Sequence, residues 1–82
     1  MSDQIYEFIF QQLEARKPLK RDAEFENLNY MNSGHIDSFG LLKFITAIEK
    51  RFNIEIEDED MMQPSFRVVH GLVDIVRRKI TQ

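Results

Sequence analysis

The chain has no cysteine, no long apolar run and no excess of basic residues, and each absence excludes a class of protein. Without cysteine there is no disulfide framework, and residues 1–4 lack the basic patch and apolar core of a secretory signal, so we expect a cytoplasmic location. No apolar run approaches the roughly 18 to 20 residues of a transmembrane helix, so we expect no integral membrane segment. A net charge of −3 argues against a protein that holds a phosphate backbone, so we expect no nucleic acid partner.

Metal-ligand patterns are also missing from the sequence. The two histidines, His35 and His70, have no partner pattern for zinc. The acidic residues between positions 55 and 60 lack the glycine and the ligand spacing of a calcium loop. We therefore predict no metal site. We expect this acidic segment and the basic segment at residues 77–79 to be solvated surfaces.

The composition that remains is that of one small globular domain. The 82 residues are 43% hydrophobic and 30% charged, which is typical of neither a disordered tail nor a membrane protein. A chain of this length buries on the order of 60 to 65% of its extended surface, so its core is thin. We predict a single domain over residues 1–82.

Residues 3–16 predict the first helix, because their apolar residues recur at spacings of three and four. Ser2 or Asp3 is available as the N-cap, and Pro18 stops the helix. The apolar face consists of Ile5, Phe8, Ile9 and Leu13.

Residues 17–36 show no sustained period and predict a long loop, with a short helical turn near residues 22–28. Loops of this length are uncommon in compact domains unless they are pinned or functional. The apolar residues that can pin this loop are Phe25, Leu28, Tyr30, Met31 and Ile36.

Residues 38–52 predict the second helix. Steps of about 100° per residue place one apolar stripe on this helix, and that stripe is expected to face the core. Its members are Leu41, Phe44, Ile45, Ile48 and Phe52. The opposite side carries the residues that we interpret as partner-binding, namely Phe39, Lys43, Thr46 and Lys50. An alternative is that Phe39 folds back over a loop residue such as Ile36.

The last third of the chain predicts a connector, a short helix and a final long helix. Ile54 and Ile56 turn inward from an extended connector, and a short helix follows over residues 58–62. Ser65 is the expected N-cap of the final helix, and Gly71 within that helix indicates close packing against a neighbour. The apolar stripe of the final helix is Phe66, Val69, Leu72, Val73, Val76 and Ile80. No strand has an obvious partner, so the predicted fold is all-α.

Asp37 and Ser38 stand at the start of the second helix, at or beside its N-cap. Side-chain oxygens at this position satisfy free backbone donors, so one interpretation of the pair is a helix cap. Free N–H groups and the helix dipole also attract negative charge, so the other interpretation is a seat for a phosphate. The pair by itself leaves both interpretations open.

The chain resembles the acyl carrier and peptidyl carrier protein family. The resemblance rests on Gly34-His35-Ile36-Asp37-Ser38-Phe39, on residues 48–52 and 54–56, and on the last-helix pattern of residues 66–76. It implies an all-α four-helix bundle of acyl-carrier type, with three long helices, one short helix and a long loop between the first two.

The resemblance also implies a function. A phosphopantetheinyl transferase would attach 4′-phosphopantetheine from coenzyme A covalently to Ser38, and Asp37 would help to present the serine. Acyl or aminoacyl groups would then be carried as thioesters, delivered and processed by separate enzymes. The chain would be a monomeric carrier with no catalytic residue of its own.

The second helix departs from the pattern of carriers of fatty acid synthesis, which usually have leucine after the serine and a strongly acidic helix. This chain has Phe39, Gly40, Lys43, Lys50 and Arg51 there. Electrostatic complementarity governs partner choice, so a mixed-charge face should fit poorly on basic docking patches. We therefore expect a specialised carrier of the polyketide, non-ribosomal peptide or D-alanine transfer type.

Three other hypotheses are weaker. The first is a small helical protein–protein interaction adaptor in which Ser38 is only a helix cap. An enzyme with a Ser38–His35 pair is disfavoured, because so small a domain leaves little room for a substrate pocket. A DNA-binding domain that uses residues 77–79 has the wrong charge balance.

Overall fold

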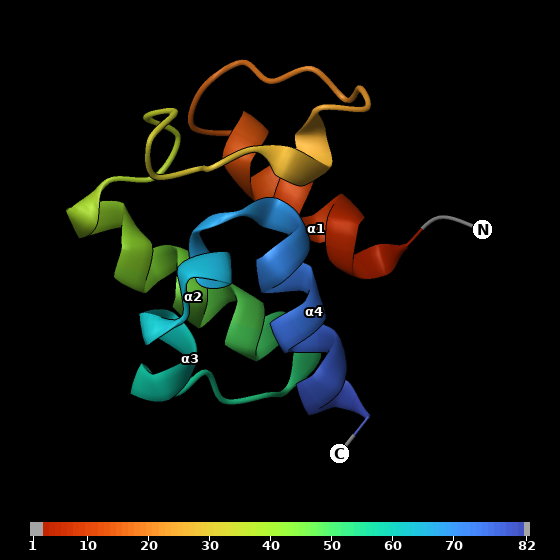
Figure 1. Ribbon diagram of the computed structural model, residues 1–82, viewed down its shortest axis with the longest axis vertical. Coiled ribbons are helices and arrows are strands. Elements are labelled where there is room, and N and C mark those ends of the chain that lie inside the picture. Colours follow the sequence, from red (N-terminus) through yellow and green to blue (C-terminus); the bar gives the residue numbers. More distant parts are fainter. Residues whose placement is uncertain (1–2, 82) are drawn as a thin grey trace.

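The structure is a computed structural model that describes residues 3–81, and it is helical (Figure 1). The long helices are α1 (Gln4–Glu14), α2 (Ser38–Phe52) and α4 (Val69–Ile80), and α3 (Asp58–Met62) is short. Two 3₁₀ turns, η1 (Phe25–Asn27) and η2 (Pro64–Arg67), complete the order of elements. Over the described range there is no strand, only an isolated bridge between Asn29 and Val68. The predicted all-α architecture is confirmed.

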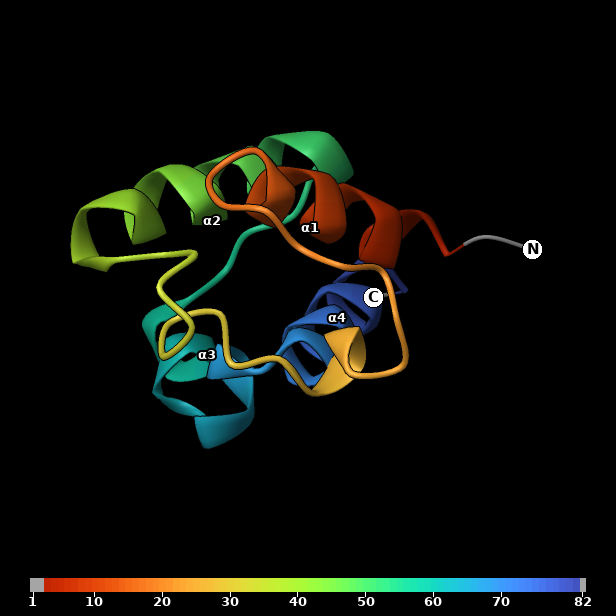
Figure 2. The ribbon, with the colours of Figure 1, turned by 90° about the horizontal axis from the view of Figure 1, so that it is seen from above.

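The four helices form two sides of the molecule. Figure 2 shows α1 and α2 along one side, with α3 and α4 along the other. The core lies between these sides, and α4 packs against α1, η1 and η2. Within residues 3–81, no helix is long and apolar enough to cross a bilayer.

Helix α1 begins one residue after the predicted start and ends two residues before the predicted end. The Asp3 carboxylate accepts a hydrogen bond from the Ile5 backbone N–H at 3.0 Å, so Asp3 is the N-cap. The other candidate, Ser2, lies outside the described residues. Three of the predicted core residues are buried, and Phe8 is half-buried with its ring edge-on to Phe52. The buried residues are Ile5, Ile9 and Leu13.

Helix α2 has the predicted bounds. Asn53 follows the last helical residue as the C-cap and adopts the left-handed conformation with φ of 54°. From the predicted stripe, Phe44, Ile45 and Ile48 are buried, whereas Leu41 and Phe52 are half-buried against the edge of the core. The connector behaves as predicted, with Ile56 buried and Ile54 half-buried.

Helix α4 differs from its prediction at its start and in which residues are buried. It begins at Val69, so Ser65 is not its N-cap and lies instead in η2. Phe66 is buried as expected, but from η2. Ile80 is 45% exposed although the stripe includes it, and Ile75 is buried although the stripe omits it. The reason is that α4 is covered on more than one side, so a single stripe does not describe its buried surface.

Gly71 is the point at which α4 meets η2. A Cβ atom at this position would overlap the carbonyl oxygen and carbonyl carbon of Ser65. The predicted close packing is therefore confirmed, and the neighbour is the backbone of η2.

The loop between α1 and α2 is pinned to the segment that precedes α4. The Tyr30 backbone N–H donates to the Arg67 carbonyl at 3.2 Å, and the Val69 N–H donates to the Leu28 carbonyl at 3.0 Å. The Tyr30 hydroxyl donates to the Phe66 carbonyl. The predicted anchors Phe25, Tyr30 and Ile36 are buried, and Leu28 and Met31 are half-buried. The long loop is thus a fixed part of the fold.

The acidic and basic segments are not simply solvated surfaces, because three of their side chains form ion pairs. Lys79 Nζ lies 2.8 Å from the Asp60 carboxylate and ties the end of α4 to α3. Arg77 forms an ion pair with Asp3 and ties α4 to the start of α1.

Replacing Asp60 with asparagine should lower the free energy of unfolding at neutral pH by roughly 0.2 to 1 kcal/mol, the range measured for such ion pairs. Burial raises the pKa of the Asp60 carboxyl, but hydrogen bonds from Lys79 and from the Glu57 backbone outweigh burial and hold that pKa below its usual value. A depressed carboxyl pKa contributes stability above the unfolded-state pKa, and this contribution is lost as the pH falls through the folded-state pKa.

The two proteins should therefore differ in urea unfolding curves near neutral pH and converge in acid. The Asn side chain still accepts from the Glu57 N–H, so the comparison isolates the charge. A difference that stays constant as the pH falls through the titration of the carboxyl would contradict this assignment.

Candidate functional site

Asp37 caps the N-terminus of α2. Its backbone is extended, and its Oδ1 accepts a hydrogen bond from the Gly40 backbone N–H at 2.7 Å. Ser38 is therefore the first residue of the helix and not its cap. The hypothesis that Ser38 serves only as a cap is wrong, because the neighbouring aspartate already has that role.

The Ser38 side chain is accessible to solvent. It is exposed, and its hydroxyl makes no hydrogen bond with any of residues 3–81. It stands on the first turn of a helix of 15 residues, where backbone N–H groups without intrahelical acceptors and the helix dipole stabilise a negative charge. An accessible hydroxyl beside such a helix end fits the attachment of a phosphodiester.

A buried side chain and a backbone hydrogen bond fix the backbone that leads into Ser38. Ile36 is 1% exposed, and its N–H donates to the Tyr30 carbonyl at 3.0 Å. Asp37 then caps the helix, so the residues on the N-terminal side of Ser38 are fixed by a core contact and by a cap. The serine is thus presented on a rigid support.

His35 belongs to this support. It is buried, with Nδ1 2.6 Å from Ser33 Oγ and Nε2 3.4 Å from the Pro18 carbonyl. The hypothetical Ser38–His35 pair is therefore not formed. The Lys17 ammonium donates to the Ser33 carbonyl at 2.7 Å and closes the same turn. The sequence carries no signal for the contact with Pro18, because Pro18 and His35 meet only through the path of the loop.

The predicted partner-binding residues share one exposed face of α2. Lys43, Thr46 and Lys50 line a shallow groove of about 410 Å³. Phe39 is 92% exposed, so the alternative in which it folds back over Ile36 is wrong. Leu42 is 73% exposed and also lines the groove. Sequence reasoning missed Leu42. A helical projection places Leu42 about 60° from Phe39, on the side of the helix that carries the predicted partner-binding residues, so the signal was present in the sequence.

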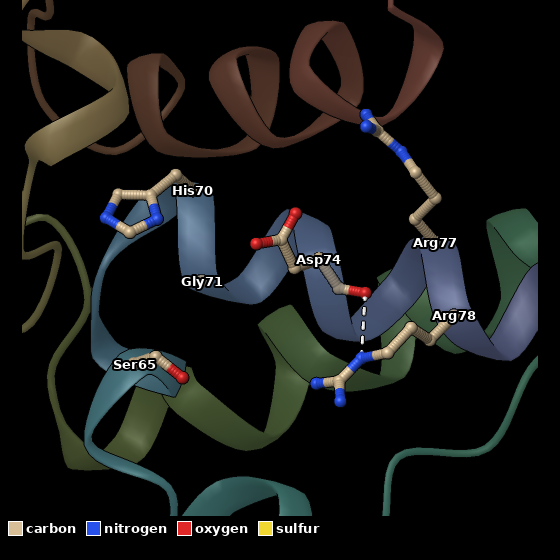
Figure 3. A pocket seen from close by; sticks show the side chains of 6 residues that line it. All are labelled: Ser65, His70, Gly71, Asp74, Arg77 and Arg78. Carbon is tan, nitrogen blue, oxygen red and sulfur yellow. Dashed lines mark hydrogen bonds between the residues drawn. The ribbon is translucent and has the colours of Figure 1, made fainter.

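A second hollow, of about 450 Å³, lies along α4 and η2 (Figure 3). Its charged side chains are mostly engaged within the protein. Arg77 points toward α1, where it pairs with Asp3, and Arg78 Nε donates to the Asp74 carbonyl at 3.4 Å. Ser65 and His70 both line this hollow, but no hydrogen bond joins their side chains, and we assign the hollow no role.

Comparison with known proteins gives the family of the chain. The chain matches the phosphopantetheine attachment site family over residues 15–76, about three quarters of its length. The matched region begins at the end of α1 and includes all of α2 and α3 and most of α4. No curated protein and no solved structure matches the chain significantly. The chain belongs to the phosphopantetheine attachment site family, as its resemblance to acyl and peptidyl carrier proteins implies.

Membership of the family defines the cofactor and the general role. Proteins of this family hold 4′-phosphopantetheine covalently and carry thioesters on its thiol. They are carriers, not enzymes, and they interact with a phosphopantetheinyl transferase and with loading and processing enzymes.

Proposed function

We propose that Ser38 is the residue to which 4′-phosphopantetheine is attached. The observation that carries this proposal is the exposed, unbonded Ser38 hydroxyl on the first turn of α2, directly after the capping Asp37. Of the other serines that the structure describes, Ser33 hydrogen-bonds to His35 and Tyr30, and Ser65 lies in η2. Asp37 has the role of holding the helix end in shape.

The partner enzymes are proposed to contact the exposed face of α2. Phe39, Lys43, Thr46 and Lys50 are the predicted contacts, and Leu42 joins them because it lines the same groove. This face lies on the helix that begins with Ser38, so an enzyme bound there is close to the attached group.

The biological context that we propose is a specialised carrier in a biosynthetic pathway of the polyketide, non-ribosomal peptide or D-alanine transfer type. Support comes from α2, where Lys43, Lys50 and Arg51 outnumber the single acidic residue Glu49. We further propose that residues 1–82 act as one monomeric, cytoplasmic carrier domain.

The attachment site is tested by intact mass spectrometry after incubation with coenzyme A, Mg²⁺ and a broad-specificity phosphopantetheinyl transferase. The unmodified protein should gain the mass of a single phosphopantetheinyl group, because Ser38 is the serine with a free hydroxyl at a helix N-terminus. The Ser38→Ala variant should gain none.

Ser65→Ala is the matched control, because Ser65 is also exposed and lies near the start of the 3₁₀ turn η2. This variant should be modified to the same extent as the parent protein. Added mass in Ser38→Ala, or no added mass in the parent protein, would overturn the assignment.

A further inference from the structure

The charges of α2 are arranged unevenly around the helix. Its only acidic residue, Glu49, is turned to the connector, where its Oε2 accepts a hydrogen bond from the Ile56 N–H at 2.8 Å. Arg51 lies over the rings of Phe8 and Phe52, with its guanidinium carbon 6.0 and 5.4 Å from their centres. Both of these charges are engaged with the protein itself.

Lys43 and Lys50 are different. Both are exposed, and neither forms an ion pair with another described residue. They line the same groove as Leu42, Thr46 and Ala47, and its lining is mainly apolar. Phe39 stands almost fully exposed one turn before this groove. The outer face of α2 is thus an apolar strip with two ammonium groups that lack counter-charges.

From this arrangement we infer that the α2 face binds a protein surface with an apolar centre and flanking carboxylates. The inference rests on the proposed function and names the chemistry of the partner enzymes at that face. Phe39 and Leu42 lose water-exposed apolar area on contact, and carboxylates on the partner meet Lys43 and Lys50.

The expected preference for an acidic partner is opposite to the preference that the net charge of the whole molecule predicts. The chain has a net charge of −3, so long-range electrostatics alone favour a cationic partner. A preference for an acidic partner therefore requires the local field of Lys43 and Lys50. This opposition makes the inference easy to test.

The probes are two amphipathic helical peptides with the same leucine and tryptophan face, one flanked by glutamates and one by lysines. Each is titrated into the ¹⁵N-labelled protein, both unmodified and modified at Ser38, and amide shifts are followed. The glutamate peptide should bind roughly tenfold more tightly than the lysine peptide, with shifts confined to α2 around residues 39–50. Raising the salt to about 1 M should remove most of that difference, because the screening length falls to about 3 Å.

The charge-reversed variant Lys43→Glu with Lys50→Glu should bind the lysine peptide more tightly than the glutamate peptide. The matched control is Lys20→Glu with Arg67→Glu, which changes the net charge by the same amount at exposed positions elsewhere. This control should keep the preference for the glutamate peptide. Phe39→Ala should weaken the binding of both peptides to the same extent, because the substitution removes apolar contact area and no charge.

Three results would overturn the inference: equal or tighter binding of the lysine peptide, shifts outside α2, or tighter binding to anionic phospholipid vesicles than to the glutamate peptide. Modification of Ser38 is measured separately by mass. A protein that is modified but fails the peptide test loses only this inference, whereas a protein that is not modified loses the proposed attachment site.

Discussion

Replacing Tyr30 with alanine should lower the free energy of unfolding by about 3 to 5 kcal/mol, the cost of removing a large aromatic side chain from a core. Tyr30 is fully buried, and its ring lies edge-on to the rings of Phe44 and Phe66, with centres 5.3 and 6.3 Å away. The variant therefore leaves a cavity where the loop, α2 and η2 meet. Urea unfolding measures the loss, and hydrogen exchange should show the loop before Ser38 opening more often.

The variant Tyr30→Phe separates packing from hydrogen bonding. Burial raises the pKa of the Tyr30 phenol, so its hydroxyl stays protonated and donates to the Phe66 carbonyl. Removing this hydroxyl leaves a buried acceptor without its donor, which costs about 1 to 3 kcal/mol. Tyr6→Phe is the control, because the Tyr6 hydroxyl makes no hydrogen bond with the described residues, and it should change stability little. If Tyr30→Phe were as stable as the parent protein, the bond to η2 would contribute nothing.

Replacing Gly71 with alanine should lower the free energy of unfolding by at least about 2 kcal/mol, in the upper part of the range for overpacking. The added methyl group would overlap the backbone carbonyl of Ser65, and backbone atoms cannot rotate aside as a side chain does. Relief requires α4 to move away from η2. Because the segment before α4 also holds the loop through Tyr30, the shift should reach the support of Ser38. Thermal and urea unfolding measure the loss of stability.

Gly40→Ala provides the contrast within the same fold. A Cβ atom at position 40 would lie 3.0 Å from Arg16 Nη1 and 3.2 Å from Asp37 Oδ1. The Arg16 guanidinium ends a flexible side chain and can move by a few tenths of an ångström. Alanine also favours a helix over glycine by about 1 kcal/mol, so Gly40→Ala should be clearly less destabilising than Gly71→Ala. Equal losses in the two variants would show that the overlap with the Ser65 backbone adds no cost at position 71.

The start of α2 shows how far local sequence can determine structure. Its bounds follow from Asp37 and Asn53, whose effects act within a few residues, as a cap and as a left-handed end. The same holds for the Asp3 cap of α1. These signals made the position of Ser38 at the head of a long helix predictable from the sequence.

The start of α4 shows the opposite case. Ser65 is a good cap by local rules, yet the chain forms η2 there and α4 begins at Val69. Two contacts with distant residues accompany this later start of α4. Val68 forms an isolated β-bridge with Asn29, and the Val69 N–H donates to the Leu28 carbonyl. Such contacts join residues far apart in the chain, so no local pattern reveals them. The burial of Ile75 and the exposure of Ile80 follow from the same tertiary packing.

For the site, the sequence by itself determined that a serine stands on the first turn of an amphipathic helix, directly after an aspartate. Only the tertiary structure decided that the Ser38 hydroxyl is left without a partner among the described residues, and that His35 is buried against the Pro18 carbonyl. It also decided that Glu49 is engaged while Lys43 and Lys50 stay unpaired. The physical reason is that periodicity and capping act along one helix, whereas the freedom of a side chain depends on every group that packs near it.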